Sequence, residues 1–290
     1  MKALVTGASG FVGRHLAQEL RESGWRVLTA ARRGPADLAG DLRSVSLRRV
    51  SVDVLFHLAA FANPSASVGR NVEAYGDNAA VTARLVREAR AGRFVLASTC
   101  QVYANSPKRM NERARIGPRT PYSAGKLCGE ALALASGRDV VVLRPFNHTG
   151  PGQSEAYVCP AIAGQIARAE AGSGPRLVTV GALAPRLDFF DVRDMARAYR
   201  LAAEKGNGGE IYNVATGAPV AVEELLRILV SMARVKLGFN ARRGDPVLVS
   251  GDSSKFRSAT GWAPRIPLPK TLSDILEFER KREGSQKRNT

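Results

Sequence analysis

Two residues with the spacing of neighbours on one helix face, Tyr122 and Lys126, could perform acid–base chemistry. Residues four apart on an α-helix point to the same side. An ammonium group beside a phenol favours the phenolate and lowers the pKa of the phenol from about 10 toward the working pH. A phenol tuned in this way can exchange a proton with a carbonyl or an alcohol. The pair therefore indicates the proton-transfer half of a redox reaction between a ketone and an alcohol.

Thr99 is a candidate for a third group at the same place. It follows an apolar run, Phe94–Ala97, that predicts a buried strand. A hydroxyl at the end of that strand could reach the carbonyl oxygen that Tyr122 would contact, and two donors stabilise a developing alkoxide better than one. Taken alone, a threonine here is more often a simple strand-end residue.

A glycine-rich loop could supply the other half of the reaction by holding a nicotinamide nucleotide. Gly7, Gly10 and Gly13 stand three apart, directly after a predicted N-terminal strand and at the start of a predicted helix. Such a loop lets the backbone approach a pyrophosphate and aims helix-terminal N–H groups at it. The spacing alone is a weak signal, because a tight turn would also need glycine. That alternative would not predict Tyr122 and Lys126 downstream.

The residues after the second predicted strand, Arg26–Ala30, indicate which nucleotide would bind. A carboxylate there would accept hydrogen bonds from the adenosine ribose and repel a phosphate, but this chain has Arg32 and Arg33. Since guanidinium groups suit a phosphate dianion, we expect NADPH, with NADH possible. A solvated basic turn without a ligand is the alternative. Asp41 and Leu42 could flank the adenine ring, although a surface turn fits them nearly as well.

Short apolar runs alternate with helical patterns through the first half of the chain. This is typical of an α/β protein with a Rossmann-type doubly wound parallel sheet. The predicted strands are Ala3–Thr6, Arg26–Ala30, Val52–Leu58, Phe94–Ala97 and Val140–Arg144. The predicted helices are Phe11–Ser23, Tyr75–Ala91 and Pro121–Ala135. The last of these has Thr120 as a suitable N-cap and a proline at its first position.

After Arg144 the elements become shorter, and a smaller, discontinuous C-terminal lobe is expected over the carboxyl ends of the strands, where open α/β sheets bind ligands. Helix Val192–Glu204 and strand Glu210–Asn213 are predicted to return to the sheet, whereas helices Val220–Ala233 and Leu268–Arg280 belong to the lobe. The expected division is a nucleotide-binding domain of residues 1–146 with 188–216, a substrate lobe of residues 147–187 and 217–282, and a frayed tail of residues 283–290.

The composition argues against several classes of protein. The 290 residues include 43 Lys and Arg against 26 Asp and Glu, a net charge of +17. Nucleic-acid binding is a minor alternative, because the arginines are spread along the chain without a recognisable binding motif, and a highly anionic small substrate explains the charge. No apolar stretch approaches the roughly 20 residues of a membrane span, and no signal peptide precedes the first strand. Three scattered cysteines fit a reducing cytoplasm, and three histidines without ligand-like spacing make no case for a metal.

The ordered set of motifs resembles the extended short-chain dehydrogenase/reductases over essentially the whole chain. Besides the glycine loop, the set includes His57–Ala60, Asn78 and Arg144–Asn147. The resemblance implies that Thr99, Tyr122 and Lys126 are catalytic and that Lys126 also holds the nicotinamide ribose. It implies a cofactor site made of Gly7, Ser9, Gly10, Phe11, Val12, Gly13, Arg32, Arg33, Asp41, Leu42, Leu58, Ala59, Ala60, Tyr122 and Lys126.

Three further signatures, Arg144–Gln153, Asp188–Asp194 and Gly261–Pro264, narrow the resemblance. Together they resemble GDP-4-keto-6-deoxy-D-mannose reductases, which make GDP-D-rhamnose. By that resemblance Tyr122 would give a proton to the 4-keto oxygen as NADPH gives a hydride to C4, and Asn147 would contact the sugar nucleotide. The face of hydride delivery is not fixed by the sequence, so the C4 epimer, GDP-6-deoxy-D-talose, is a second possible product.

Gln101 separates this chain from two related classes. Sugar 4,6-dehydratases of the family have a glutamate two residues after the catalytic threonine, and fucose-forming epimerase/reductases have a cysteine there. An uncharged amide can act as neither acid nor base. Gln101 could instead bind substrate by orienting a hydroxyl, which suits a plain reductase. A polar strand-end side chain is the alternative.

Charged residues of the second lobe are expected to bind the diphosphate and ribose of the substrate. Arg242 and Asp245 resemble the family's element in which an arginine meets phosphate and an acid meets ribose hydroxyls. Arg186 is displaced by one position from the family pattern, because Leu187 stands where the arginine is usual. A one-residue shift on a strand turns a side chain to the other face. Either the backbone bulges to bring Arg186 inward, or Arg242 or Arg243 compensates.

Two other functions stay open. A nucleotide-sugar C4-epimerase would keep a tightly bound NAD and show no net redox change, and the two arginines after the second strand argue against it. A catalytically silent NADP(H)-binding module that senses redox state is the alternative of another class, and the presence of Thr99, Tyr122 and Lys126 argues against it. The expected partner is a GDP-linked sugar, with no nucleic acid and no membrane. The family resemblance also implies a homodimer through the helices Tyr75–Ala91 and Pro121–Ala135.

Overall fold

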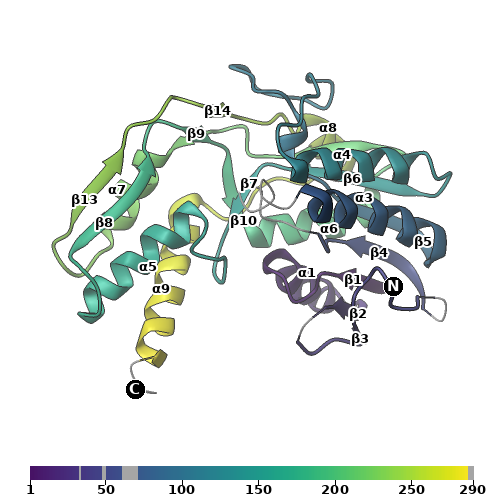
Figure 1. The fold of residues 1–290 in the computed structure, drawn as a ribbon, viewed down its shortest axis with the longest axis horizontal. Helices are drawn as coiled ribbons and strands as arrows, with labels where there is room; N and C mark the ends of the chain where they lie inside the picture. The colour runs from purple at the N-terminus through teal and green to yellow at the C-terminus, as the bar shows by residue number, and fades with distance from the viewer. Residues whose placement is uncertain (33, 48–49, 61–70, 287–290) are drawn as a thin grey trace.

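A seven-stranded parallel sheet forms the centre of the structure, a computed structural model that describes residues 1–32, 34–47, 50–60 and 71–286, with the backbone alone at 71–77 and 286 (Figure 1). The strand order is β11-β6-β5-β4-β1-β2-β3, and every neighbouring pair is parallel. The predicted Rossmann-type fold class is confirmed. The strands are β1 (Lys2–Thr6), β2 (Arg26–Ala31), β3 (Leu38–Ala39), β4 (Ser51–His57), β5 (Arg90–Ala97), β6 (Val140–Pro145) and β11 (Ile211–Val214).

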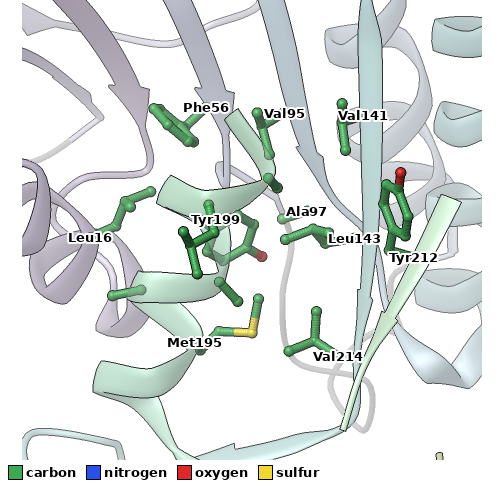
Figure 2. Close-up of a cluster of buried hydrophobic side chains, with 14 of the residues drawn as sticks. Leu16, Phe56, Val95, Ala97, Val141, Leu143, Met195, Tyr199, Tyr212 and Val214 are labelled. Atoms are coloured by element: carbon green, nitrogen blue, oxygen red, sulfur yellow. The ribbon is translucent and has the colours of Figure 1, made fainter. Parts of the chain in front are cut away.

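Both faces of this sheet are buried, because alternate side chains of each strand enter different cores. On β1, Val5 belongs to the cluster that contains Leu16 of α1 (Phe11–Glu22), whereas Leu4 belongs to the cluster that contains Leu85 of α3 (Asn71–Glu88). Figure 2 shows part of the first cluster, between the strands and a covering helix. Burial on two faces explains why these strands are continuous apolar runs in the sequence.

Helices cover the sheet in two layers. On one face α1 packs against α6 (Val192–Lys205), which contributes Met195 and Tyr199 to the core in Figure 2. On the other face α3 packs against α4 (Pro121–Leu134). The predicted return of a late helix and strand to the sheet is confirmed by α6 and β11.

One predicted boundary is wrong. The helix expected to reach Ala91 ends at Glu88, and β5 begins at Arg90 rather than Phe94. Ala91 is paired with Val52 of β4 and is buried. The glycine in this stretch, Gly92, lies inside β5 and not at the end of the helix, so the pairing of strands sets the boundary.

The C-terminal elements pack around a separate apolar cluster, drawn at the left of Figure 1. Its main contributors are α5 (Val158–Ala171), α7 (Val222–Ser231), α9 (Leu268–Gln286) and β8 (Leu177–Ala182), which pairs with β13 (Gly238–Arg242). Short strands connect this part to the sheet. They are β7 (Asn147–Thr149) with β10 (Phe189–Asp191), and β12 (Val220–Ala221), β9 (Arg186–Leu187) and β14 (Leu248–Val249). The remaining elements are the 3₁₀ turn η1 (Cys100–Val102) and α8 (Ser254–Thr260).

The tail expected to fray from residue 283 is in fact the last part of α9. Glu283 is buried and accepts a hydrogen bond from the Ser173 hydroxyl, and Arg280 pairs with Glu170 of α5 at 2.7 Å. The run of charges resembles a solvated tail, yet its side chains find partners on α5. Residues 287–290 lie outside the described residues.

The remaining expectations about organisation are less fully tested. Among the described residues no helix is both long and apolar enough to cross a bilayer. The division of the chain into a nucleotide-binding domain and a substrate lobe stays a prediction.

Candidate active site

A cleft of about 760 Å³ lies at the carboxyl ends of β1, β4 and β5, at the point where the strand order reverses. That volume and position are usual for a ligand site in an open α/β fold. Most residues predicted from the sequence line it: Gly7, Ser9, Gly10, Phe11, Val12, Gly13, Arg32, Asp41, Leu42, Leu58, Ala59, Ala60, Thr99, Gln101, Tyr122, Lys126 and Asn147. Arg33 lies outside the described residues.

The glycine loop is shaped by close backbone contacts. Gly7 has a φ of 71°, which favours glycine, and a Cβ on Gly13 would lie 2.1 Å from the Gly7 carbonyl oxygen. Gly10 is the N-cap of α1 and provides no side-chain hydrogen bond to the helix. The first N–H groups of α1 therefore have no side-chain cap where they meet the cleft, an arrangement suited to an anion.

Arg32 lines the cleft just beyond β2 with an exposed side chain. Asp41, which also lines the cleft, forms an ion pair with Arg43 at 2.6 Å. Hydrogen bonds from the side chain and the backbone N–H of Arg43 lower the pKa of Asp41 to about 2. Asp37 accepts hydrogen bonds from Thr29 and is not part of the cleft wall. A cationic side chain is therefore accessible at this end of the cleft, while the nearby acid is already paired.

Helix α4 presents Tyr122 and Lys126 to the opposite end of the cleft. The helix begins with a reciprocal capping box between Thr120 and Ser123 and a proline in its first turn. Tyr122 and Lys126 are both buried, and the Lys126 Nζ donates to the Ala97 carbonyl at 2.7 Å. The start of the helix is thus fixed where its polar side chains meet the end of β5.

Thr99 lies beside this pair. Its hydroxyl caps η1 by accepting a hydrogen bond from the Gln101 N–H at 3.2 Å, and the hydroxyls of Thr99 and Tyr122 are hydrogen-bonded. Thr99, Tyr122 and Lys126 therefore all line the same end of the cleft.

The predicted lowering of the tyrosine pKa is wrong. Burial raises the pKa of Tyr122, and the hydrogen bond with Thr99 offsets only part of this effect. Burial also lowers the pKa of Lys126 to about 8, against the favourable charge of Glu130. Lys126 is not among the groups that shift the pKa of Tyr122, so the expected influence of the ammonium gives way to desolvation. Tyr122 consequently keeps its proton at neutral pH and can donate it.

Comparison with known proteins places this geometry in a family. Residues 3–215 match the model of the NAD dependent epimerase/dehydratase family. The chain belongs to this family. Over 303 residues it is 32% identical to the GDP-6-deoxy-D-mannose reductase of Pseudomonas aeruginosa, with 95% of this chain and 96% of the relative covered. It is 30% identical to the UDP-glucose 4-epimerase of Azospirillum brasilense, with 98% and 93% covered.

A solved structure agrees with the sequence relatives. The structure of RMD from Pseudomonas aeruginosa complexed with NADPH has a TM-score of 0.89 and 31% identity, with 97% of this chain and 99% of that chain covered. The predicted resemblance to the extended short-chain dehydrogenase/reductases is confirmed. The chain is an enzyme of the nucleotide-sugar-modifying type within the epimerase/dehydratase family.

The substrate-side predictions for this family member have different outcomes. Gln101 lies in the cleft wall with an exposed side chain. Asn147 lies on β7 in the same wall, and its Nδ2 is buried without a hydrogen-bond partner among the described residues. A buried donor without a partner is costly, so a ligand acceptor at this position would satisfy it.

The structure does not bring Arg186 to the cleft. Strand β9 pairs with its neighbours without a bulge, so Leu187 lines the cleft while Arg186 is exposed and donates to the Pro219 carbonyl at 3.2 Å. The inward bulge considered for Arg186 is therefore wrong. Arg242 and Asp245 are also exposed and lie outside the cleft wall. Their contact with a substrate stays a prediction.

Among the residues of the site region that the sequence analysis did not identify are Tyr157, His148 and Glu130. Tyr157 and His148 line the cleft; His148 stacks on Phe11 with an interplanar angle of 4°. Glu130 is buried one turn beyond Lys126 on α4. The helical spacing that relates Tyr122 to Lys126 also relates Lys126 to Glu130, so this signal could have found it. No comparable pattern marks the other two.

Proposed function

We propose that this chain reduces the 4-keto group of GDP-4-keto-6-deoxy-D-mannose with NADPH, which gives GDP-D-rhamnose or its C4 epimer, GDP-6-deoxy-D-talose. The observation that carries the proposal is the hydrogen-bonded pair of hydroxyls, Thr99 and Tyr122, at the end of the cleft next to Lys126. A reduction needs a proton donor at the carbonyl oxygen, and both hydroxyls can donate to that oxygen once it replaces the hydrogen bond between them. The similarity to a GDP-6-deoxy-D-mannose reductase supports this substrate class.

The proposed cofactor fits the other end of the cleft. The N-terminus of α1 without a side-chain cap at Gly10 suits the pyrophosphate, and Arg32 suits the 2′-phosphate of NADPH more than a bare ribose. When bound, NADPH supplies the hydride. The NADPH complex of a structural neighbour at 31% identity supports the same choice. NADH stays possible, because Arg32 would contact only the additional phosphate.

The side chains then have separate tasks. Tyr122 donates its proton to the carbonyl oxygen as C4 becomes tetrahedral, and Thr99 donates a hydrogen bond to the same oxygen. Lys126, bonded to the Ala97 carbonyl, places a positive charge near the phenolate that remains on Tyr122. The product is an alcohol, with one hydride and one proton added. Gln101, an amide with no useful acid or base form, orients a substrate hydroxyl.

The substrate is held by the wall opposite the cofactor. Asn147, with its unsatisfied buried Nδ2, is proposed to donate to the sugar nucleotide. Arg242 and Asp245 are proposed to reach the diphosphate and ribose from their exposed positions, in the absence of Arg186 from the cleft wall. The substrate lobe of residues 147–187 and 217–282 would supply these contacts.

A homodimer through α3 and α4 and a cytoplasmic location belong to the same proposal. Leu132 on α4 is 42% exposed, as a residue buried by a second copy would be. The three free cysteines suit a reducing compartment. Light scattering of the purified protein would measure the oligomeric state.

The experiment supplies the purified protein with NADPH and the product of a GDP-mannose 4,6-dehydratase. We expect the NADPH absorbance to fall in proportion to the ketosugar, and NMR of the product then gives the C4 configuration. The epimerase alternative, which the relative from Azospirillum brasilense represents, predicts tightly bound NAD and no net consumption. Cofactor binding with no turnover of this or related ketosugars would favour the sensor module instead.

A further inference from the structure

Glu130 is the centre of a buried polar network directly behind the active site. Its side chain is 2% exposed and forms an ion pair with Arg144 of β6, whose side chain is 4% exposed. The guanidinium contacts both carboxylate oxygens, with Nε donating to Oε1 at 3.0 Å and Nη2 donating to Oε2 at 2.5 Å. The Ser98 hydroxyl also donates to Oε1. A carboxylate this deep in the fold is thereby fully paired.

The network continues from Arg144 away from the cleft, to Tyr103 and Asn213. Arg144 Nη1 lies 3.0 Å from the Tyr103 hydroxyl, and its guanidinium lies over the Tyr103 ring at 4.9 Å. The Tyr103 hydroxyl donates to the Asn213 Oδ1 of β11 at 2.7 Å. The ion pair is therefore anchored to β6, to β11 and to the segment of Ser98 and Tyr103, and Glu130 has little freedom to move.

Helix α4 uses three successive turns of one face to hold three successive residues at the end of β5. Tyr122 is hydrogen-bonded to Thr99, Lys126 donates to the Ala97 carbonyl, and Glu130 accepts from Ser98. Side chains at four-residue spacing share a face, so this arrangement follows directly from the helix repeat. The position of Thr99 thus depends on the bond that its neighbour makes with Glu130.

The charge of Glu130 also acts on Lys126. Burial lowers the pKa of Lys126, and Glu130 is the group that opposes this effect. The other groups around Lys126 give it little help. His57 of β4 is buried and its pKa is lowered to about 3, so it is neutral. On α3, the Asn78 carbonyl and the Thr82 side chain, which lie against Gly129 of α4, are uncharged. Arg144 carries the same charge as Lys126.

We propose that Glu130 is a positioning residue for the reduction proposed above, which it serves by fixing Ser98, and through it Thr99, and by keeping Lys126 in its charged form. Tyr122 would then be left beside a cation when it gives up its proton. The expected effect of Glu130 on turnover rests on the proposed function. The effect of Glu130 on Lys126 can be measured without any substrate.

The first test titrates Lys126 by NMR in protein labelled with ¹³Cε-lysine, with the signal assigned by a Lys126→Met variant. In the unchanged protein we expect a midpoint near pH 8. Glu130→Gln removes the favourable charge, so the ammonium form is lost at lower pH and the midpoint should move down by about one pH unit. Glu130→Asp retains the charge and should leave the midpoint nearly unchanged. An equal midpoint in Glu130→Gln and the unchanged protein would overturn the electrostatic part of the proposal.

The second test measures kcat and KM over pH with the ketosugar. Glu130→Gln should lower kcat at least about tenfold, since Thr99 is displaced, and move the alkaline limb to lower pH. Ser98→Ala, the matched control, removes the bond but keeps the charge, so it should lower kcat without moving the limb. Glu204→Gln on α6 removes a carboxylate whose ion pair within the described part of the chain is with Arg200, and it should change neither quantity.

A purely structural role for Glu130 predicts a different pattern. Thermal stability would fall in Glu130→Gln while both the Lys126 midpoint and the alkaline limb stay in place, and the proposal would then be wrong. If the single variant does not fold, Glu130→Gln with Arg144→Met avoids an unpaired buried cation and should still move the midpoint down, by less than one pH unit because a like charge is lost as well. If the protein turns over no ketosugar, the proposed function fails, while the substrate-free titration still decides the role of Glu130.

Discussion

At the scale of single residues, burial reinforces the protonated form of Tyr122. The side chain is 9% exposed and its pKa is raised. Reduction of a ketone needs this protonated form, whereas oxidation of an alcohol needs the phenolate. The protonated phenol therefore suits the proposed reduction, in which Lys126 would stabilise the phenolate after the proton has moved.

Replacing Tyr122 by phenylalanine tests this role of the hydroxyl. The ring fills the same space, but the proton donor is gone, so kcat should fall by roughly two to four orders of magnitude. The affinity for NADPH, measured by fluorescence titration, should stay within about twofold because the ring still packs as before. A variant that retains near-normal turnover would exclude Tyr122 as the acid.

The choice between the two dinucleotides should depend on Arg32. Hydrogen bonds to a charged group contribute about 1.5–3 kcal/mol, so Arg32→Ala should raise the KM for NADPH about 10- to 100-fold and leave the KM for NADH nearly unchanged. Arg26→Ala is the control, because Arg26 is exposed at the start of β2 and does not line the cleft. Equal effects of Arg32→Ala on both cofactors would contradict a phosphate contact.

The sequence identified the catalytic candidates better than the substrate-binding ones, for a physical reason. Tyr122 and Lys126 are related by the helix repeat, which a sequence shows directly. The direction of Arg186 depends instead on the pairing of a two-residue strand, and Leu187 takes the inward position. The pKa of Tyr122 was also beyond prediction, because it depends on how completely the fold removes water from the hydroxyl.

At the scale of elements, the tight packing of the glycine loop against α1 fixes the place where the cofactor would bind. A Cβ on Gly13 would lie 2.1 Å from the Gly7 oxygen and 2.8 Å from the Ala8 Cα, both backbone atoms that cannot move without disturbing the loop. Gly13→Ala should therefore lower the free energy of unfolding by about 1–3 kcal/mol in chemical denaturation, and weaken NADPH binding.

A glycine in open space provides the control for this substitution. A Cβ on Gly181 of β8 would meet no atom within 4 Å among the described residues, so Gly181→Ala should change the free energy of unfolding by no more than about 0.5 kcal/mol. Similar losses in both variants would show that the contact at Gly13 is not the cause.

The elements that could be predicted are those whose burial produces a recognisable apolar pattern in the sequence. The sheet strands buried on both faces are apolar runs, and four of the five predicted in the first half match within about two residues at each end. The short strands β7, β9, β10, β12 and β14 are only two or three residues long, and their conformation depends on partners distant in the chain. The end of α9 could not be predicted for the opposite reason, because its charged side chains pair with Glu170 of α5 and with Glu155, just before α5.

At the scale of the whole molecule, the sheet and the C-terminal elements contribute opposite walls of one cleft. The glycine loop and α4 come from the sheet layer, whereas Tyr157, Leu187 and Phe189 come from segments beyond β6. The net charge of +17 suits two anionic ligands in this cleft, a dinucleotide and a sugar nucleotide. A reductase must bring both together so that the hydride and the proton reach the same carbonyl.

The most direct test is whether a hydride passes from the cofactor to the sugar carbonyl. It uses NADPH with deuterium at the hydride-donating position of its nicotinamide C4 and follows the transfer of deuterium to the ketosugar. For the GDP-linked 4-ketosugar with the unchanged protein, we predict one deuterium atom at C4 of the product hexose, seen by NMR and mass spectrometry, and one NADPH consumed for each carbonyl reduced. Product without deuterium at C4, or interconversion of C4 epimers with no NADPH consumed, would contradict the assignment of this chain as a ketosugar reductase.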